Sequence, residues 1–235
     1  MTGDDDRLLM TPGPTAVPAT VRRAMGRPLQ NPDVDPAFTA FYRELLIKLR
    51  AVYDTEDDVH ILAGEGMLGL EAAVASIIEP GDHVLCLANG RFGAGFADLV
   101  ERHGGTAVTL DHPDDRGLPV DPVKTAVEDG TFVAATMVHC ETPTGLLNDL
   151  DEILGVLGDA GILTVVDAVS SLGGTRVPVG RIDLCLGASQ KCLSAPPGLT
   201  TVSVSDGAWA RIDTVEQRSF YTSLRPWGDL DLDRE

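Results

Sequence analysis

The sequence predicts an α/β fold in which helices cover both faces of a mostly parallel sheet, giving three layers (α/β/α). Three observations favour it. Short, continuous apolar runs alternate with segments of helical periodicity, glycine-rich polar loops follow those runs, and 235 residues are enough for one large or two small domains. Continuous apolar runs are typical of strands in a parallel sheet, because such strands are buried on both faces.

Seven segments have the length and apolar character of buried strands. They are Val59–Ala63, His83–Ala88, Thr106–Leu110, Phe132–Val138, Ile162–Asp167, Ile182–Gly187 and Thr200–Val204. The clearest helix begins at Pro36, with apolar residues at helical spacing up to Tyr53. Four further helices are predicted, at Gly66–Ile78, Ala94–Arg102, Asp121–Glu128 and Leu150–Gly158. This alternation predicts a helix-covered sheet.

The composition argues against several classes of function. Acidic residues number 36 against 18 basic ones, a formal net charge of −18. That balance disfavours nucleic acid and anionic membrane surfaces as partners, since both attract basic proteins. No apolar stretch is long enough to span a membrane, and Asp4-Asp5-Asp6 has the wrong sign for the start of a signal peptide. We therefore expect a cytoplasmic protein.

The four cysteines indicate reduced thiols. Cys86, Cys140, Cys185 and Cys192 are scattered along the chain and form no CxxC pair. This spacing favours neither a disulfide framework nor a zinc site, so no metal is expected.

Reactive and glycine-rich residues follow the predicted strands. The segments concerned are Gly64–Met67, Asn89–Gly93, His139–Gly145, Asp167–Val169 and Ala188–Lys191. In open α/β sheets the ligand binds beyond the carboxyl ends of the strands. The sequence therefore predicts a binding site along that edge.

The glycine pattern Gly64–Gly69 matches GxGxxG between a strand and a helix. A nicotinamide-binding fold would need an acidic residue about 20 positions later, at the end of the next strand. That strand ends at Asn89 instead, which disfavours an oxidoreductase of the Rossmann type. Two interpretations are left: a phosphate bound at the helix N-terminus, or a plain glycine turn.

Lys191 is the most informative residue. It follows an apolar strand directly, precedes a stiff Pro196-Pro197-Gly198 turn, and is one of three lysines in the chain. A lysine in a partly desolvated cleft is a nucleophile toward aldehydes. Asp167 at a strand end is by itself a helix cap or a salt-bridge partner, but beside such a lysine it can hold a proton on a pyridine ring. Phe92 is either a core residue or a ring that stacks on a flat cofactor.

With these motifs the chain resembles the class V aminotransferases, enzymes of fold type I that use pyridoxal 5′-phosphate (PLP). The alanine–glyoxylate, serine–glyoxylate and serine–pyruvate group is the most similar. The matching segments are Leu9–Thr15, Gly66–Ala72, Asn89–Gly93, His139–Gly145, Val166–Gly174 and Ser189–Gly198. The related cysteine desulfurases carry histidine before the PLP lysine, whereas Gln190 stands here, which favours the aminotransferase branch.

The resemblance implies the chemistry of three residues. Lys191 forms the Schiff base with PLP and then carries the proton between the substrate Cα and the cofactor. Asp167 pairs with the pyridinium nitrogen, and Thr142 lies near the ring hydroxyl.

The resemblance also implies how PLP is held. Phe92 stacks on one face of the ring, where relatives often have tryptophan, and Val169 packs on the other. The phosphate is bound by the backbone N–H groups of Gly66 and Met67 and by the side chain of Gln190. Glu65 and Pro143 depart from the family pattern, since hydroxyl residues are more usual at both places.

The resemblance implies an aminotransferase that moves an amino group from alanine or serine to glyoxylate or pyruvate, working as a homodimer. We expect residues 1–20 to form an N-terminal arm and residues 21–235 the PLP-binding large domain. The chain is expected to be truncated before a small C-terminal domain, which in the family supplies the arginine for the substrate carboxylate. Two alternatives are left open: 2-aminoethylphosphonate–pyruvate transamination, and a remnant that binds PLP without turnover.

Overall fold

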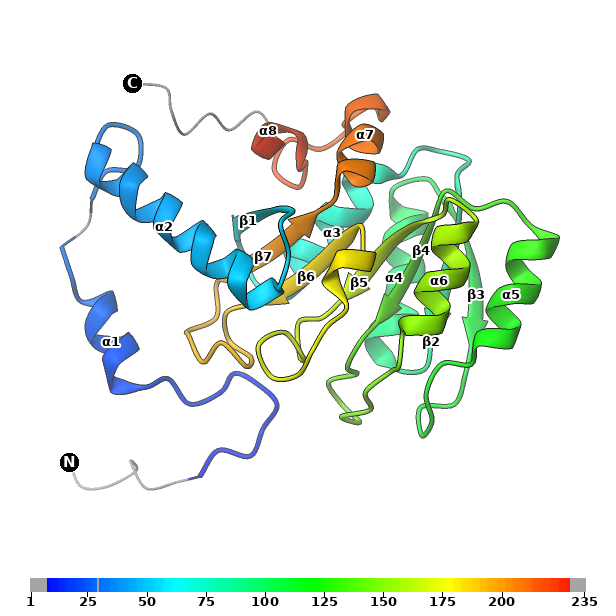
Figure 1. The fold of residues 1–235 in the computed structure, drawn as a ribbon, viewed down its shortest axis with the longest axis horizontal. Helices are drawn as coiled ribbons and strands as arrows, with labels where there is room; N and C mark the ends of the chain where they lie inside the picture. Colours follow the sequence, from blue (N-terminus) through cyan, green and yellow to red (C-terminus); the bar gives the residue numbers. More distant parts are fainter. Residues whose placement is uncertain (1–7, 29, 229–235) are drawn as a thin grey trace.

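A sheet of seven strands runs through the computed structural model, which describes residues 8–28 and 30–228 (Figure 1). The strand order is β1-β7-β6-β5-β4-β2-β3. The strands are β1 (Asp58–Ala63), β2 (His83–Ala88), β3 (Thr106–Asp111), β4 (Ala134–Val138), β5 (Leu163–Asp167), β6 (Leu184–Ala188) and β7 (Leu199–Val204). Strands β3, β2, β4, β5 and β6 are mutually parallel, and β7 is antiparallel to both β6 and β1. The sheet is therefore mostly parallel.

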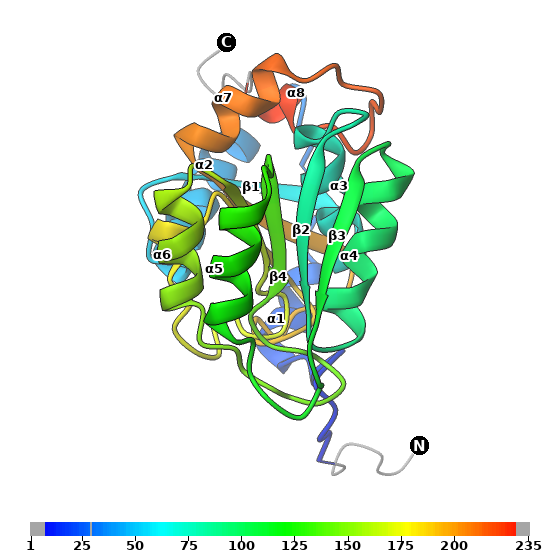
Figure 2. The ribbon, with the colours of Figure 1, turned by 90° about the vertical axis from the view of Figure 1, so that its right-hand side faces the viewer.

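Helices cover both faces of the sheet. The helices are α1 (Ala19–Met25), α2 (Pro36–Tyr53), α3 (Gly66–Ile77), α4 (Arg91–Arg102), α5 (Val120–Asp129), α6 (Asp151–Asp159), α7 (Asp206–Thr214) and α8 (Arg225–Gly228), with a 3₁₀ turn η1 (Val179–Arg181). Figure 2 shows α3 and α4 on one side of the strands and α5 and α6 on the other. The three predicted layers are confirmed.

Strand β2 illustrates how a continuous apolar run serves two cores. Val84 and Cys86 belong to the hydrophobic cluster beneath α3 and α4. Leu85 and Leu87 point the other way and belong to the cluster beneath α5 and α6. Successive side chains of a strand alternate between faces, so a strand covered on both sides needs apolar residues at every position.

All seven predicted strands are present, with ends that differ by at most two residues. The five predicted helices are also present, but α4 begins at Arg91 and not at Ala94. The extra turn places Phe92 inside the helix. Helices α1, α7 and α8 were not predicted. The acidic residues Asp4-Asp5-Asp6 and the last seven residues lie outside the described ranges.

Within the described residues, no helix combines the length and the apolar composition needed to cross a bilayer. All four cysteines are free thiols.

Candidate active site

The residues predicted to bind a cofactor come together at one edge of the sheet. Loops after β1, β2, β4, β5 and β6 supply them, and Figure 1 shows these loops along the lower edge, with the segment before α1 running beneath it. The carboxyl ends of parallel strands share an edge, which explains why residues far apart in sequence meet here.

Lys191 lies in the turn that follows β6, three residues after Ala188, and is only 9% exposed. It makes no ion pair with any residue in the described part of the chain, and buried lysines are rare unless they are paired. Thr15 fixes its backbone, because the Thr15 hydroxyl donates to the Lys191 carbonyl at 2.9 Å and the Thr15 N–H donates to the Gln190 carbonyl at 2.9 Å. The position therefore suits a chemical role better than a structural one.

Gly13 packs against the lysine stem. A Cβ atom at this position would stand 2.5 Å from the Lys191 Cδ, closer than real contacts allow. The N-terminal segment thus forms one wall of the site, which the sequence analysis did not assign. The Leu9–Thr15 motif was the only signal, and the motif alone does not say what its residues touch.

Asp167 ends β5, the strand next to β6, and its carboxylate is 5% exposed. Burial, with a smaller contribution from the negative charge of Glu141, raises the pKa of Asp167 to about 7. The Val169 N–H donates to Asp167 Oδ1 at 2.8 Å and acts in the opposite direction, as does the charge of Lys191. A cationic group brought against this carboxylate would be bound strongly.

The first turn of α3 presents backbone N–H groups to the site. Glu65 is the N-cap residue, but its exposed side chain makes no capping hydrogen bond to the helix. The N–H groups of Gly66 and Met67 therefore receive nothing from the cap and suit an anion, which the helix dipole also favours. A Cβ at Gly66 would approach a Val169 methyl at 3.1 Å, so glycine permits this close packing of α3 on the β5 loop.

Gln190 contributes an unsatisfied polar atom. The side chain is 7% exposed, and its Oε1 atom has no hydrogen-bond partner among the described residues. Buried polar atoms are usually paired, so an unpaired one in a site suggests a missing ligand or water.

Thr142, Phe92 and Val169 complete the predicted set. Thr142 lies after β4, and its hydroxyl forms a short hydrogen bond with the Ser170 hydroxyl from the β5 loop. Phe92 is half-buried in the first turn of α4, and Val169 is buried beside Asp167. Ser170 and Glu141, which binds the start of α4, are site neighbours that sequence reasoning missed.

These residues fit PLP. The amine of Lys191 can bind an aldehyde, the Asp167 carboxylate can hold a protonated ring nitrogen, and the start of α3 can take a phosphate. Gly66 leaves the N–H groups of the first α3 turn open to an anion. The Gln190 oxygen has no partner that would hold it among the described residues, so the amide can turn its NH₂ group, the donor, towards a phosphate. Each functional group of the cofactor thus has a matching protein group.

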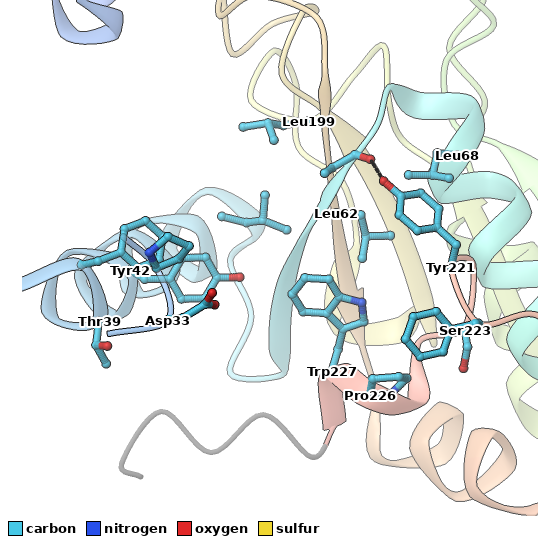
Figure 3. A pocket seen from close by; sticks show the side chains of 15 residues that line it. Asp33, Thr39, Tyr42, Leu62, Leu68, Leu199, Tyr221, Ser223, Pro226 and Trp227 are labelled. Carbon is cyan, nitrogen blue, oxygen red and sulfur yellow. Dashed lines mark hydrogen bonds between the residues drawn. The ribbon is translucent and has the colours of Figure 1, made fainter. Parts of the chain in front are cut away.

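An apolar cavity of about 690 Å³ lies elsewhere, between α2, β1 and the segment that leads into α8. Figure 3 shows its walls, with Tyr42 and Thr39 on one side and Trp227 and Tyr221 on the other, where the Tyr221 hydroxyl donates to the Ala63 carbonyl at 3.2 Å. None of the predicted site residues lines it. Its walls are mostly apolar, and its lining contains no lysine, histidine or cysteine, so the predicted chemistry belongs to the edge site.

The family model described as aminotransferase class-V matches residues 19–223. The chain belongs to the class V aminotransferase family. Among class V relatives, an uncharacterized aminotransferase of Methanocaldococcus jannaschii is 38% identical over 222 residues, covering 93% of this chain and 57% of its own length. The pyridoxamine–pyruvate transaminase of Mesorhizobium japonicum is 34% identical, covering 95% and 58%.

A solved class V structure agrees with the fold. The alanine–glyoxylate aminotransferase of Nostoc sp. superposes with a TM-score of 0.89 at 28% identity, covering 97% of this chain and 65% of that one. The chain thus spans a little over half the length of the curated class V relatives it matches.

Proposed function

We propose that the chain is the cofactor-binding part of a PLP-dependent aminotransferase, with Lys191 as the residue joined to PLP. The observation that carries the proposal is the buried Lys191 beyond β6 next to the buried Asp167 at the end of β5, with β5 and β6 paired in parallel. A lone buried amine beside a buried carboxyl is costly to the fold and is explained by a ligand that uses both.

When bound, PLP supplies an aldehyde and an electron-accepting ring that stabilises negative charge at the substrate Cα. The chain's own residues do the rest. The Lys191 amine would bind the aldehyde and be released when the amino group of the substrate takes its place there. The freed amine would then move a proton at the substrate Cα. Asp167 holds a proton on the ring nitrogen. Phe92 and Val169 hold the ring between them and exclude water from its faces.

The phosphate site and the ring hydroxyl have their own partners in this proposal. The N–H groups of Gly66 and Met67 and the Gln190 side chain hold the phosphate, where the start of α3 provides a favourable dipole. Thr142 binds the ring hydroxyl. Glu65 is exposed at the cap position, so its charge can stay in solvent, away from the anion.

For substrates we propose alanine or serine as amino donor and glyoxylate or pyruvate as acceptor. The names of the relatives support this class, since they transaminate with pyruvate or glyoxylate. The proposal also includes a homodimer, a cytoplasmic location supported by the four free thiols, an arm at residues 1–20 and a large domain at 21–235. Helix α1 crosses the boundary at residue 20, and only part of the arm is described.

The first test is a covalent one. Adding PLP to the purified chain and reducing with borohydride should fix one adduct, which peptide mapping places on Lys191. The chain has only two other lysines, Lys48 and Lys124, both exposed on their side chains. Lys191→Arg should abolish the adduct and Lys124→Arg should leave it unchanged. An adduct spread over Lys48 and Lys124, or none, contradicts the proposal.

The second test concerns turnover. Alanine or serine added to the unreduced, PLP-loaded chain should be converted to its 2-oxo acid, detected by mass spectrometry. If 2-aminoethylphosphonate is converted to phosphonoacetaldehyde but alanine and serine are not converted, the result favours the aminophosphonate alternative. A Lys191 adduct without any amino transfer would show a chain that binds PLP without turnover.

A further inference from the structure

Glu141 is a fully buried carboxyl group that the proposed chemistry does not use. It lies in the loop after β4, with 0% of its surface exposed. Its oxygens point at the start of α4: Oε1 accepts from the Gly93 N–H at 2.7 Å and Oε2 from the Phe92 N–H at 3.3 Å. Glu141 therefore caps α4, although it comes 48 positions after Gly93 in the sequence.

The surroundings are shaped to hold that carboxyl. A Cβ at Gly90 would stand 2.4 Å from the Glu141 Cδ, so only glycine leaves room for it. A Cβ at Gly93 would meet the Ala88 backbone at 3.1 Å and Glu141 Oε1 at 3.4 Å. The loop itself is fixed, because the Glu141 N–H donates to the Leu146 carbonyl and the Glu141 carbonyl accepts from the Gly145 N–H at 2.8 Å.

No basic side chain in the described ranges forms an ion pair with Glu141. A buried carboxyl usually needs a counter-charge or several hydrogen bonds. Here the backbone N–H groups and the positive end of the α4 dipole provide that compensation. The capped turn contains Phe92, the ring proposed to stack on PLP.

We propose that Glu141 is a positioning residue of the cofactor site: it fixes the first turn of α4 and thereby the plane of the Phe92 ring. The inference rests on the proposed function. Glu141 touches neither the cofactor nor the substrate in this arrangement. We propose that its main effect on cofactor binding passes through Phe92, beside the small effect of its charge on the pKa of Asp167. A helix cap that served stability alone would affect unfolding but leave cofactor binding unchanged.

The variant Glu141→Gln separates these roles. Glutamine keeps the volume, but its side chain has one acceptor oxygen where the carboxylate has two, and its NH₂ group would face an N–H donor. We expect PLP to bind about tenfold more weakly, the loss of one hydrogen bond to a charged group. The circular dichroism band of bound PLP should also change, because it reports the ring's surroundings.

A matched control is available in α2. Asp35 caps that helix by accepting from the Ala37 N–H at 2.9 Å, in a different part of the fold. Asp35→Ala should lower the melting temperature, as cap removal does, and leave the PLP dissociation constant unchanged. If Glu141→Gln behaves like Asp35→Ala, with lower stability and unchanged PLP binding and dichroism, Glu141 is a structural cap and the inference is wrong.

A double-mutant cycle with Phe92→Leu tests whether Glu141 acts through Phe92. Both single variants should weaken PLP binding, and the double variant should be little weaker than Phe92→Leu alone, since the ring that Glu141 positions is gone. Additive losses overturn the inference. If Glu141→Gln does not fold, Gly90→Ala displaces the same carboxyl and is used in its place.

Failure of the inference about Glu141 can be distinguished from failure of the proposed function. A wild-type chain that binds no PLP contradicts the proposed function, and the inference falls with it. A wild-type chain that binds PLP at Lys191 but shows an additive cycle contradicts the role of Glu141 alone.

Discussion

Gly13 shows how a single missing side chain shapes the site. The Lys191 stem fills the space where a Cβ would stand, at 2.5 Å. Gly13→Ala should displace either the N-terminal segment or the lysine, and an error of about 1 Å in a reacting group can cost up to roughly a hundredfold in rate. We expect adduct formation with PLP at least about tenfold slower, measured by stopped-flow absorbance.

The control for this variant is Gly26→Ala. Gly26 follows α1, and a Cβ there would only touch the Arg23 carbonyl at 3.6 Å, an ordinary contact. Equal rates for Gly13→Ala, Gly26→Ala and wild type would mean that the segment before α1 does not shape the lysine site.

Asp167 links the stability of the PLP-free chain to pH. Its pKa is raised from 3.8 to about 7, so the folded chain favours the protonated form. The stability that this group contributes is full below pH 3.8 and is lost as the pH rises towards 7. Asp167→Asn cannot ionise. It should therefore gain roughly 1–4 kcal/mol over wild type between pH 4 and pH 8 in denaturant titrations without PLP.

The same variant should lose amino transfer, because the ring nitrogen would have no anion to keep it protonated. A stability difference between Asp167→Asn and wild type that does not change with pH would show that Asp167 is ionised at low cost in the PLP-free fold.

At the scale of residues, the sequence predicts the role of a residue when that role follows from the neighbouring sequence. Asp167 ends the apolar run of β5 and Lys191 lies three residues after that of β6, so their place near a strand end can be predicted from the sequence. Glu141 and Gly13 could not be assigned in this way. Their roles depend on the start of α4 and on the stem of Lys191, which are distant in sequence, and no local pattern records such contacts.

His60 links β1 to the two C-terminal helices. It is 7% exposed, its ring nitrogens have no partner among the described residues, and it packs edge-on against Trp209 at 5.4 Å between centroids. Trp227 lies at 6.2 Å. Burial lowers the pKa of His60 to about 4. The charge of Asp58 raises this pKa by a smaller amount, and the charge of Arg50 lowers it. The neutral ring is the form that the fold accepts.

The sign of the pH effect follows. Stability from His60 is full above its ordinary pKa of about 6.5 and is lost as the pH falls towards 4. His60→Leu should remove part of that acid sensitivity, on the order of 1–3 kcal/mol between pH 6.5 and 4. Tryptophan fluorescence during urea unfolding measures it. An unchanged acid profile in His60→Leu would assign the sensitivity to other groups.

The elements that were predicted and those that were not differ in how they bury surface. Most of the predicted strands are continuous apolar runs, a pattern that burial on two faces favours, although β3 and β7 also contain Thr or Ser. Helix α1 has no buried residue, so it shows no apolar stripe to detect. Helix α7 contains Gly207, a weak helix former, and is started by the Ser205 hydroxyl, which accepts from the Ala208 N–H at 3.1 Å.

Helix α8 is held by a contact with another element. The Arg225 guanidinium donates to the carbonyls of Val215 and Asp213, at 2.6 and 3.0 Å, and so satisfies the end of α7. The sequence of a four-residue helix does not reveal these hydrogen bonds to another helix, so α8 could not be predicted. The same hydrogen bonds give Arg225 a structural role.

At the scale of the whole molecule, the formal net charge of −18 predicts that salt stabilises the fold. Like charges repel one another over the folded surface, and salt screens them with a Debye length of about 10 Å at 0.1 M. We expect the melting temperature to rise by several degrees, on the order of 5 °C, between about 0.05 and 0.5 M NaCl. A melting temperature that is flat or falls with NaCl would mean that favourable ion pairs outweigh the repulsion.

The pairing of β1 with β7 sets the order in which the site can be assembled. Asp58 pairs with Val204, so the edge strand that leads into α3 waits for the last strand of the sheet. On the ribosome β1 emerges long before β7, and closing so large a loop is slow. The turn of α3 that we propose to bind the phosphate can therefore reach Lys191 only late. Capture of the cofactor would mark a newly synthesised chain whose sheet is complete, and it cannot guide the early steps of folding.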